Sequence, residues 1–170
     1  MKKVIVSLLI VATTSTTVIY SQTKKTETKM ETTTNKETTL NLSKAIMNGQ
    51  WDKVDALLDD NFSYTGDGQA PINKQQYIYF MKEMLCTAMT KMDMKFLRVV
   101  SEGDFVAVDY TNEMTNSGPF FGIPATGKRI LATGQFMREV KNGKVIAEWQ
   151  TTNNYGMMVQ LGVIPPPKGK

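Results

Sequence analysis

The spacing of apolar residues predicts helices in the first half of the chain. Apolar residues recur every three or four positions in residues 40–60 and again in residues 74–89, which is the pattern of a helix with one buried face. Asn48 and Gly49 interrupt the first stretch, and glycine at such a position commonly ends a helix. We therefore expect two short helices in residues 40–60 and a third in residues 74–89.

The second half of the chain alternates between apolar and polar residues and predicts strands. This alternation, with many β-branched and aromatic residues, is typical of half-buried strands. Asn142 and Gly143 predict a tight hairpin turn. The expected strands cover residues 91–100, 105–115, 128–140 and 145–153. Helices followed by hairpin-linked strands indicate an α+β fold, with the helices packed on one face of an antiparallel sheet.

The N-terminus has the pattern of an export signal. Lys2 and Lys3 precede an apolar run over residues 4–11, and small residues follow as far as Ser21, which is typical of a secretory signal peptide. The run is far shorter than the roughly 20 residues that cross a bilayer, so no membrane insertion of the mature chain is expected. The mature protein is expected to be secreted or periplasmic.

Composition divides the chain into four parts. Residues 1–21 are the predicted signal peptide. Residues 22–39 are rich in Thr, Lys and Glu and offer little to bury, so they predict a disordered spacer. A single domain is expected in residues 40–165, followed by a short tail in residues 166–170.

Charge and composition exclude several classes of function. Loss of Lys2 and Lys3 with the signal lowers the formal net charge from +4 to +2, and we find no basic cluster that predicts nucleic-acid binding. The chain has no histidine and one cysteine, Cys86. It therefore lacks Ser-His and Cys-His nucleophilic pairs, cannot form an internal disulfide, and offers a poor ligand set for zinc.

Several segments in the second half of the chain resemble one protein family. In order they read EGDFV at 102–106, GPFFGIPATGKR at 118–129, FMR at 136–138, NGKVI at 142–146, EW at 148–149 and GMMVQLG at 156–162. Together they resemble the SnoaL-like family of polyketide and ester cyclases, and the resemblance covers residues 40–164.

The resemblance implies an NTF2-like cone, in which a strongly curved antiparallel sheet and about three N-terminal helices enclose an apolar cavity. Characterised members of the family close rings by an intramolecular aldol reaction and use no metal or organic cofactor. An aspartate acts as general acid or base, helped by a nearby polar residue that is often histidine. The resemblance also implies a homodimer, formed through the convex side of the sheet.

The chain departs from the family pattern at two positions. In the family, Trp is usually followed four residues later by the catalytic Asp, and here Asn153 follows Trp149 at that spacing. A second acidic position, three residues before Arg138, is Gln135. Residues four apart on a strand share a face, so we expect Trp149, Asn153 and Gln135 to face the cavity. Two amides, which suit ligand binding and cannot act as general bases, would then replace two carboxylates.

The other candidates are tyrosines, methionines and one aromatic residue of the crossover. A buried tyrosine can orient a ligand through its hydroxyl, and methionine adapts its shape to irregular ligands. Asp67, in a loop that could cover the cavity mouth, is one of the remaining acids, and the catalytic residue stays unassigned. The predicted ligand-binding residues are Tyr64, Tyr110, Met114, Phe120, Gln135, Met137, Trp149, Asn153 and Met157.

The sequence leaves three functions open. The first hypothesis, based on the amides, is an exported protein that binds a small, largely apolar molecule. The second is a cofactor-free cyclase or isomerase, of the aldol or ester-cyclase type, that uses an unidentified carboxylate. The third is an accessory domain whose cavity is filled by its own side chains. An Asp or Glu side chain that reaches the cavity would favour the enzyme.

Overall fold

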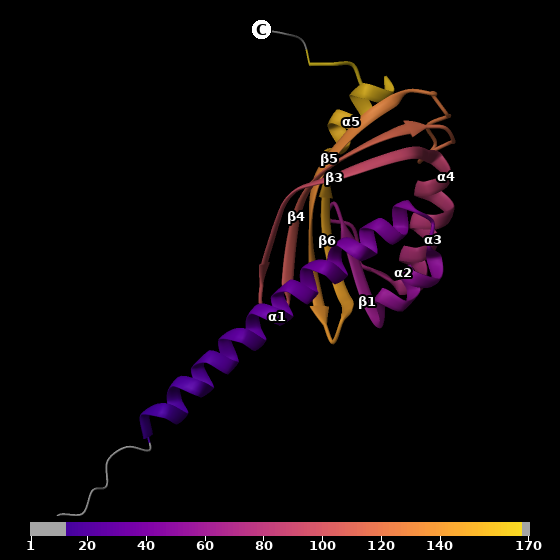
Figure 1. Ribbon diagram of the computed structural model, residues 1–170. Helices are drawn as coiled ribbons and strands as arrows, with labels where there is room; N and C mark the ends of the chain where they lie inside the picture. Colours follow the sequence, from indigo (N-terminus) through magenta and orange to yellow (C-terminus); the bar gives the residue numbers. More distant parts are fainter. Residues whose placement is uncertain (1–12, 168–170) are drawn as a thin grey trace, which may run out of the picture.

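The computed structural model describes residues 13–167 of the chain. Figure 1 shows a curved sheet with helices on one side and a long N-terminal helix that extends past its edge. The helices are α1 (Thr13–Met47), α2 (Trp51–Leu57), α3 (Lys74–Tyr79), the π-helix η1 (Phe80–Leu85), α4 (Cys86–Ala88) and α5 (Asn154–Leu161). The strands are β1 (Leu58–Gly66), β2 (Ile72–Asn73), β3 (Met89–Glu102), β4 (Phe105–Asn116), β5 (Arg129–Lys141) and β6 (Lys144–Thr152).

Within the described range the strands form one sheet in the order β2-β1-β6-β5-β4-β3. Neighbouring strands are antiparallel except β1 and β6, which run parallel. The sheet is curved and open, and α1 packs across β3 to β6 on its inner side (Figure 1). The predicted α+β class is confirmed, and the parallel pair is the one departure from a purely antiparallel sheet in this part of the chain.

The hairpin between β5 and β6 has the turn that the sequence predicts. Asn142 and Gly143 have φ angles of 51° and 75°, which are the left-handed values required at both central positions of a type I′ turn. Glycine adopts this conformation without steric cost, and asparagine tolerates it better than most residues. The flanking pair Lys141–Lys144 closes the ladder, so the hairpin prediction is confirmed.

Two groups of buried apolar side chains lie on the inner side of the sheet. One group lies under α1 to α3 and includes Leu42, Val54 and Tyr77. The other lies beside α5 and includes Met89 and Ile130. Residues of both groups line a cavity on this side, so the core both supports the sheet and shapes the candidate site.

The third predicted helix is present but changes geometry partway along. It begins with a capping box, in which Asn73 and Gln76 exchange two side chain–backbone hydrogen bonds of 3.0 Å. After α3 the chain continues as the π-helix η1, a rare geometry that often occurs at functional sites. Phe80, Met81 and Leu85 of η1 line the cavity, so the π-helix lies at the candidate site.

The predicted spacer, residues 22–39, is helical in the structure and belongs to α1. Its last part packs on the domain: Asn35, Thr38 and Thr39 are buried, and Asn35 Nδ2 donates to the Gly103 carbonyl at 3.3 Å. Packing of this end stabilises a helix that its composition alone would not, and the disorder of the spacer stays a prediction. The packed domain begins near Asn35 rather than at residue 40.

The ends of the chain bear on the predicted signal peptide and tail. Residues 1–12 of the predicted signal peptide and residues 168–170 of the predicted tail lie outside the described residues. Among the helices that the structure describes, none has the length and apolar character needed to cross a bilayer.

Candidate functional site

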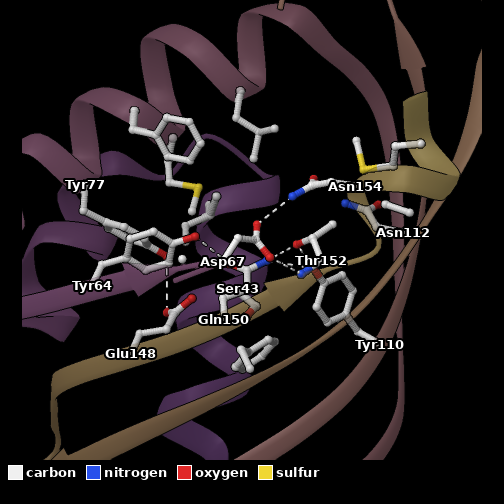
Figure 2. Close-up of a pocket in the computed structure, with 18 of the residues that line it drawn as sticks. Ser43, Tyr64, Asp67, Tyr77, Tyr110, Asn112, Glu148, Gln150, Thr152 and Asn154 are labelled. Atoms are coloured by element: carbon white, nitrogen blue, oxygen red, sulfur yellow. Dashed lines mark hydrogen bonds between the residues drawn. The ribbon is translucent and has the colours of Figure 1, made fainter. Parts of the chain in front are cut away.

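A cavity of about 700 Å³ lies on the inner side of the sheet (Figure 2). This volume is in the range of small-molecule sites, which are mostly apolar with a few placed polar groups. Because the cavity is open, the hypothesis of a cavity filled by its own side chains is wrong. The polar residues that line it are Ser43, Tyr64, Asp67, Tyr77, Tyr110, Asn112, Arg138, Glu148, Gln150, Thr152 and Asn154.

Five of the predicted ligand-binding residues line the cavity: Tyr64, Tyr110, Met114, Phe120 and Met157. Tyr64 belongs to β1, Tyr110 and Met114 to β4, and Met157 to α5, while Phe120 lies in the crossover after β4. The strand alternation predicted for residues 105–115 is correct, and it is what brings Tyr110 and Met114 to the cavity. Whether these residues bind a ligand stays a prediction.

Four predicted residues lie elsewhere, and their predicted placement is wrong. Gln135, Met137 and Trp149 line a separate hollow of about 510 Å³ on the outer face of the sheet. Met137 and Trp149 are each 39% exposed there. Asn153 is exposed and caps α5, where its Oδ1 accepts a hydrogen bond from the Gly156 amide at 2.9 Å.

A bulge in β6 explains the error for Trp149, whereas Gln135 and Met137 lie on the outer face through the regular pairing of β5 with β4. Glu139 and Val140 are consecutive on β5, but their partners Ala147 and Val145 are two residues apart on β6, so β6 has one extra residue between them. Such a bulge reverses which residues face inward beyond it. Arg138 of β5, which lies on the inner face beside Val106 of β4, therefore pairs with Glu148 of β6.

The bulge also overturns the argument from amides. The β6 residues that line the cavity are Glu148, Gln150 and Thr152 rather than Trp149 and Asn153. The inner face thus carries a carboxylate and an amide, and the two amides thought to replace acids point away from it. The first hypothesis, a protein that only binds, loses its main support.

Asp67 supplies a second carboxylate, at the edge of the cavity. Its Oδ1 accepts from the Thr152 amide at 2.8 Å, and its Oδ2 accepts from Asn154 Nδ2 at 2.9 Å. The Asp67 amide donates to the Gln150 carbonyl at 2.9 Å. Its φ of 49° is unusual for a residue other than glycine. These bonds hold the carboxylate in one place between β1 and the end of β6 (Figure 2).

Two tyrosines and a glutamine form a hydrogen-bonded group in the cavity wall. The Tyr64 hydroxyl donates to Gln150 Oε1 at 3.2 Å, and Gln150 Nε2 donates to the Tyr110 hydroxyl at 2.7 Å. The Tyr110 hydroxyl also lies 3.1 Å from Thr152 Oγ1. Because Tyr110 accepts from Gln150, its own proton can be donated to Thr152 or to a ligand oxygen.

Both tyrosines hold their protons more tightly than usual. Burial is the largest cause of the raised pKa of Tyr64, and the negative charges of Glu148 and Asp67 add to it. Burial also raises the pKa of Tyr110, although its hydrogen bonds to Thr152 and Gln150 act in the opposite direction. Both hydroxyls are therefore neutral donors at ordinary pH.

An ion pair lies in the most buried part of the cavity wall. Arg138 Nε donates to Glu148 Oε2 at 2.7 Å, and the two side chains are 3% and 2% exposed. The Tyr77 hydroxyl donates to the same Glu148 oxygen at 3.3 Å. Arg138 Nη1 donates to Ser43 Oγ at 2.9 Å and to the Thr39 carbonyl. These bonds tie β5 and β6 to α1.

The sequence-based interpretation missed Arg138, Glu148 and Gln150 as cavity residues. Counting back from the hairpin turn without a bulge pairs Arg138 with Ala147 and places Glu148 on the outer face. The sequence did contain a signal for this pair, because Arg138 and Glu148 carry opposite charges and lie at nearly opposite positions on the two strands of a hairpin. A buried charge needs such a partner.

The described residues offer little for a metal ion. Across residues 13–167, side chains of the types that commonly ligate metals, His, Cys, Asp and Glu, form no group of three able to hold one.

Comparison with known proteins places this geometry in a family. Residues 37–161 match the family model of SnoaL-like polyketide cyclases, which covers most of the chain. Among curated proteins, none matches the chain.

Solved structures share the fold at low sequence identity. The proposed SnoaL-like polyketide cyclase from Jannaschia sp. CCS1 is 22% identical, with a TM-score of 0.73 over 79% of this chain and 96% of that one. IdmH, a proposed polyketide cyclase from Streptomyces antibioticus, is 23% identical, with a TM-score of 0.67 over 75% and 98%. An LEH-like epoxide hydrolase from M. tuberculosis is 19% identical, with a TM-score of 0.64 over 78% and 92%. The predicted cone-shaped fold is confirmed.

Proposed function

Because the chain belongs to the SnoaL-like polyketide cyclase family, we propose that it binds a small, largely apolar molecule and moves a proton on it. Asp67 is the proton-transferring group, and ring closure or isomerisation beside a carbonyl group is the reaction class. The relatives named as polyketide cyclases support this class. The observation that carries the proposal is a carboxylate fixed at the edge of a mostly apolar cavity.

Asp67 meets the requirements for general acid–base catalysis. The group must titrate, must be held in place, and must lie next to a site where a ligand displaces water. Two hydrogen bonds fix its carboxylate, and its left-handed φ is a conformation that commonly persists where the surrounding structure enforces it. Glu148 is less suited, because it is almost completely buried and already forms an ion pair with Arg138.

The proposed reaction begins when the Asp67 carboxylate takes a proton from a carbon next to a carbonyl group. The electron pair of that C–H bond forms an enolate, and negative charge develops on the carbonyl oxygen. The Tyr110 hydroxyl, oriented by Gln150, donates a hydrogen bond to this oxygen. The carbanionic carbon then attacks a second carbonyl of the same molecule, and the protonated Asp67 returns the proton to the resulting alkoxide.

A generic substrate tests this proposal without knowledge of the natural one. A base removes a proton from the ring carbon beside the nitrogen of 5-nitrobenzisoxazole. The N–O bond then breaks, which yields a coloured nitrile-bearing phenolate. The Asp67 carboxylate would take that proton and release it to water. We expect the protein to accelerate this ring opening and Asp67→Asn to lower kcat/KM about a hundredfold, the usual contribution of a general base.

Asn suits position 67 as a test residue because it tolerates a left-handed φ and still accepts from the Thr152 amide. Asp109→Asn is the matched control, since Asp109 pairs with Arg98 on the outer face. The control should keep the wild-type rate. Equal rates for wild type and Asp67→Asn would show that Asp67 is not the base.

Export and assembly are also proposals. The N-terminal pattern supports export, which cleavage after Ser21 would establish by mass spectrometry of the secreted protein. Exposed apolar residues on the outer face, among them Val100, Phe105 and Trp149, support a homodimer formed there. Analytical ultracentrifugation of the wild type and of Trp149→Lys would test this, because a charge in the interface should yield a monomer.

A further inference from the structure

Asn112 is a buried polar residue in the cavity wall whose side-chain oxygen lacks a partner among the described residues. It is 5% exposed, and within residues 13–167 its Oδ1 has no hydrogen-bond partner. Its side chain lines the cavity, on the same inner face as Tyr110 (Figure 2). An unpaired buried amide carries a desolvation cost, and such groups in folded proteins generally have a reason.

The neighbours of Asn112 on the sheet are apolar. It pairs with Met94 on β3 and with Ala132 on β5, and Met114 follows it on the inner face of β4. None of these three side chains can donate a conventional hydrogen bond to the amide oxygen. The strand therefore presents a lone amide in an apolar stretch of the wall.

Asn116, on the same face of the same strand, is an asparagine with a structural role and serves as a comparison. Its Oδ1 accepts from the Thr126 amide at 2.8 Å and from Thr126 Oγ1 at 2.9 Å. Its Nδ2 donates to the Gly118 carbonyl at 2.8 Å. Asn116 thus holds the crossover in place, whereas the Asn112 Oδ1 has no partner among the described residues.

We propose that Asn112 is a specificity-determining residue that recognises a hydroxyl or N–H group of the ligand. This deepens the proposed function and rests on its claim that the cavity binds a small molecule. Same-face residues two apart on a strand are roughly 7 Å apart, so Asn112 and Tyr110 address different parts of one ligand. The ligand class is then an apolar, ring-containing body with a polar group at Tyr110 and Gln150 and a hydrogen-bond donor at Asn112.

Two related phenols test this assignment by calorimetry. The probe 2,6-dihydroxynaphthalene carries hydroxyls at both ends, and 2-naphthol carries one. We expect the wild type to bind the diol about tenfold more tightly, because the second hydroxyl gains a hydrogen bond at little cost. In Asn112→Leu that advantage should disappear, since a second hydroxyl would meet an apolar side chain.

The same variant separates recognition from a structural role. Because Leu has a similar size and needs no partner, Asn112→Leu should keep or raise the Tm of the ligand-free protein. Gln135→Leu removes an amide from the outer face and should leave the diol advantage intact. Asn112→Val, which suits a strand and has one side-chain heavy atom fewer than Asn, replaces Asn112→Leu if that variant does not fold.

Several outcomes would overturn the assignment, and they differ from failure of the proposed reaction. A diol advantage that survives loss of the amide, a large drop in Tm, or no binding of either phenol would each contradict it. Ring opening of 5-nitrobenzisoxazole reports on Asp67 and does not need the second hydroxyl. If that activity depends on Asp67 while the diol advantage survives Asn112→Leu, the reaction stands and the recognition role fails.

Discussion

The buried ion pair between Arg138 and Glu148 gives a sharp test of which strand faces point inward. Replacing one member of such a pair leaves the other charge buried and alone, which costs about 3–5 kcal/mol. Arg138→Met also removes the donors to Ser43 and to the Thr39 carbonyl, so the upper part of this range is expected. Glu148→Leu removes the acceptor that Tyr77 and Arg138 share.

The double variant Arg138→Met/Glu148→Leu should be no less stable than either single variant, because it buries no lone charge. The coupling free energy is then at least about 3 kcal/mol, at the upper end of measured couplings. Urea unfolding followed by tryptophan fluorescence gives all four free energies. Since domains are typically stable by about 5–15 kcal/mol, each single variant should remain folded but marginal.

A surface pair provides the control. Arg129 and Glu113 are 47% and 45% exposed and form an ion pair at 2.9 Å, and exposed pairs contribute at most about 1 kcal/mol. Arg129→Met should therefore change stability little. If Arg138→Met costs no more than this control, or if the two buried substitutions are additive, Arg138 does not lie on the inner face and the bulge assignment is wrong.

Three further predictions concern the tyrosines, one glycine and one helix cap. Burial raises the pKa of Tyr64 and Tyr77 in the folded protein above the usual 10.0. The free energy of unfolding should therefore be highest below pH 10 and should fall as the pH rises above 10, because the unfolded chain loses these protons more readily. Urea midpoints should fall from pH 10 upward, less steeply in Tyr64→Phe. A Cβ at Gly134 would lie 2.5 Å from the Thr151 carbonyl and 2.7 Å from the Tyr110 hydroxyl. Gly134→Ala should thus cost roughly 1–3 kcal/mol, measured by thermal unfolding. Asn73→Ala loses the capping-box bond that the Asn73 side chain accepts from the Gln76 amide and should cost about 1 kcal/mol in the same assay, and a neutral result would contradict the cap.

Much of the fold follows from local pattern. The break at Asn48–Gly49, the hairpin at Asn142–Gly143 and the inner face of β4 depend on short-range rules, and the structure confirms them. Glycine and asparagine fix such turns because few other residues adopt left-handed φ values. The helical conformation of residues 22–39 was not predictable in this way, since it depends on packing at one distant end.

The site was only half predictable, and a single extra residue explains the error on β6. The extra residue in β6 reverses its inward face, which moved Trp149 out and brought Glu148 and Gln150 in. Hydrophobicity favoured the wrong face of β6, because a tryptophan such as Trp149 is expected in a core and a glutamate such as Glu148 is not. Only the complementary charge of Arg138 makes a buried glutamate possible.

The sequence suggested Asp67 as a candidate acid but did not assign it a catalytic role. Its place in a Gly-rich loop at the cavity mouth was expected, but its role depends on bonds to Thr152 and Asn154, which are far along the chain. The alternation of β4 was predicted, but the lack of a partner for the Asn112 side-chain oxygen follows from its neighbours on β3 and β5. The roles of both residues depend on contacts between strands, which no local sequence pattern encodes.

The central claim is that small apolar molecules enter the cavity on the inner side of the sheet, and the chain's 12 methionines can report this directly. In ¹³C-methyl methionine NMR spectra, 2,6-dihydroxynaphthalene should shift the methyl signals of the cavity residues Met81, Met114 and Met157. Met137, on the outer face, should stay unchanged. A shift of Met137 with no change at the three cavity methionines would contradict the account.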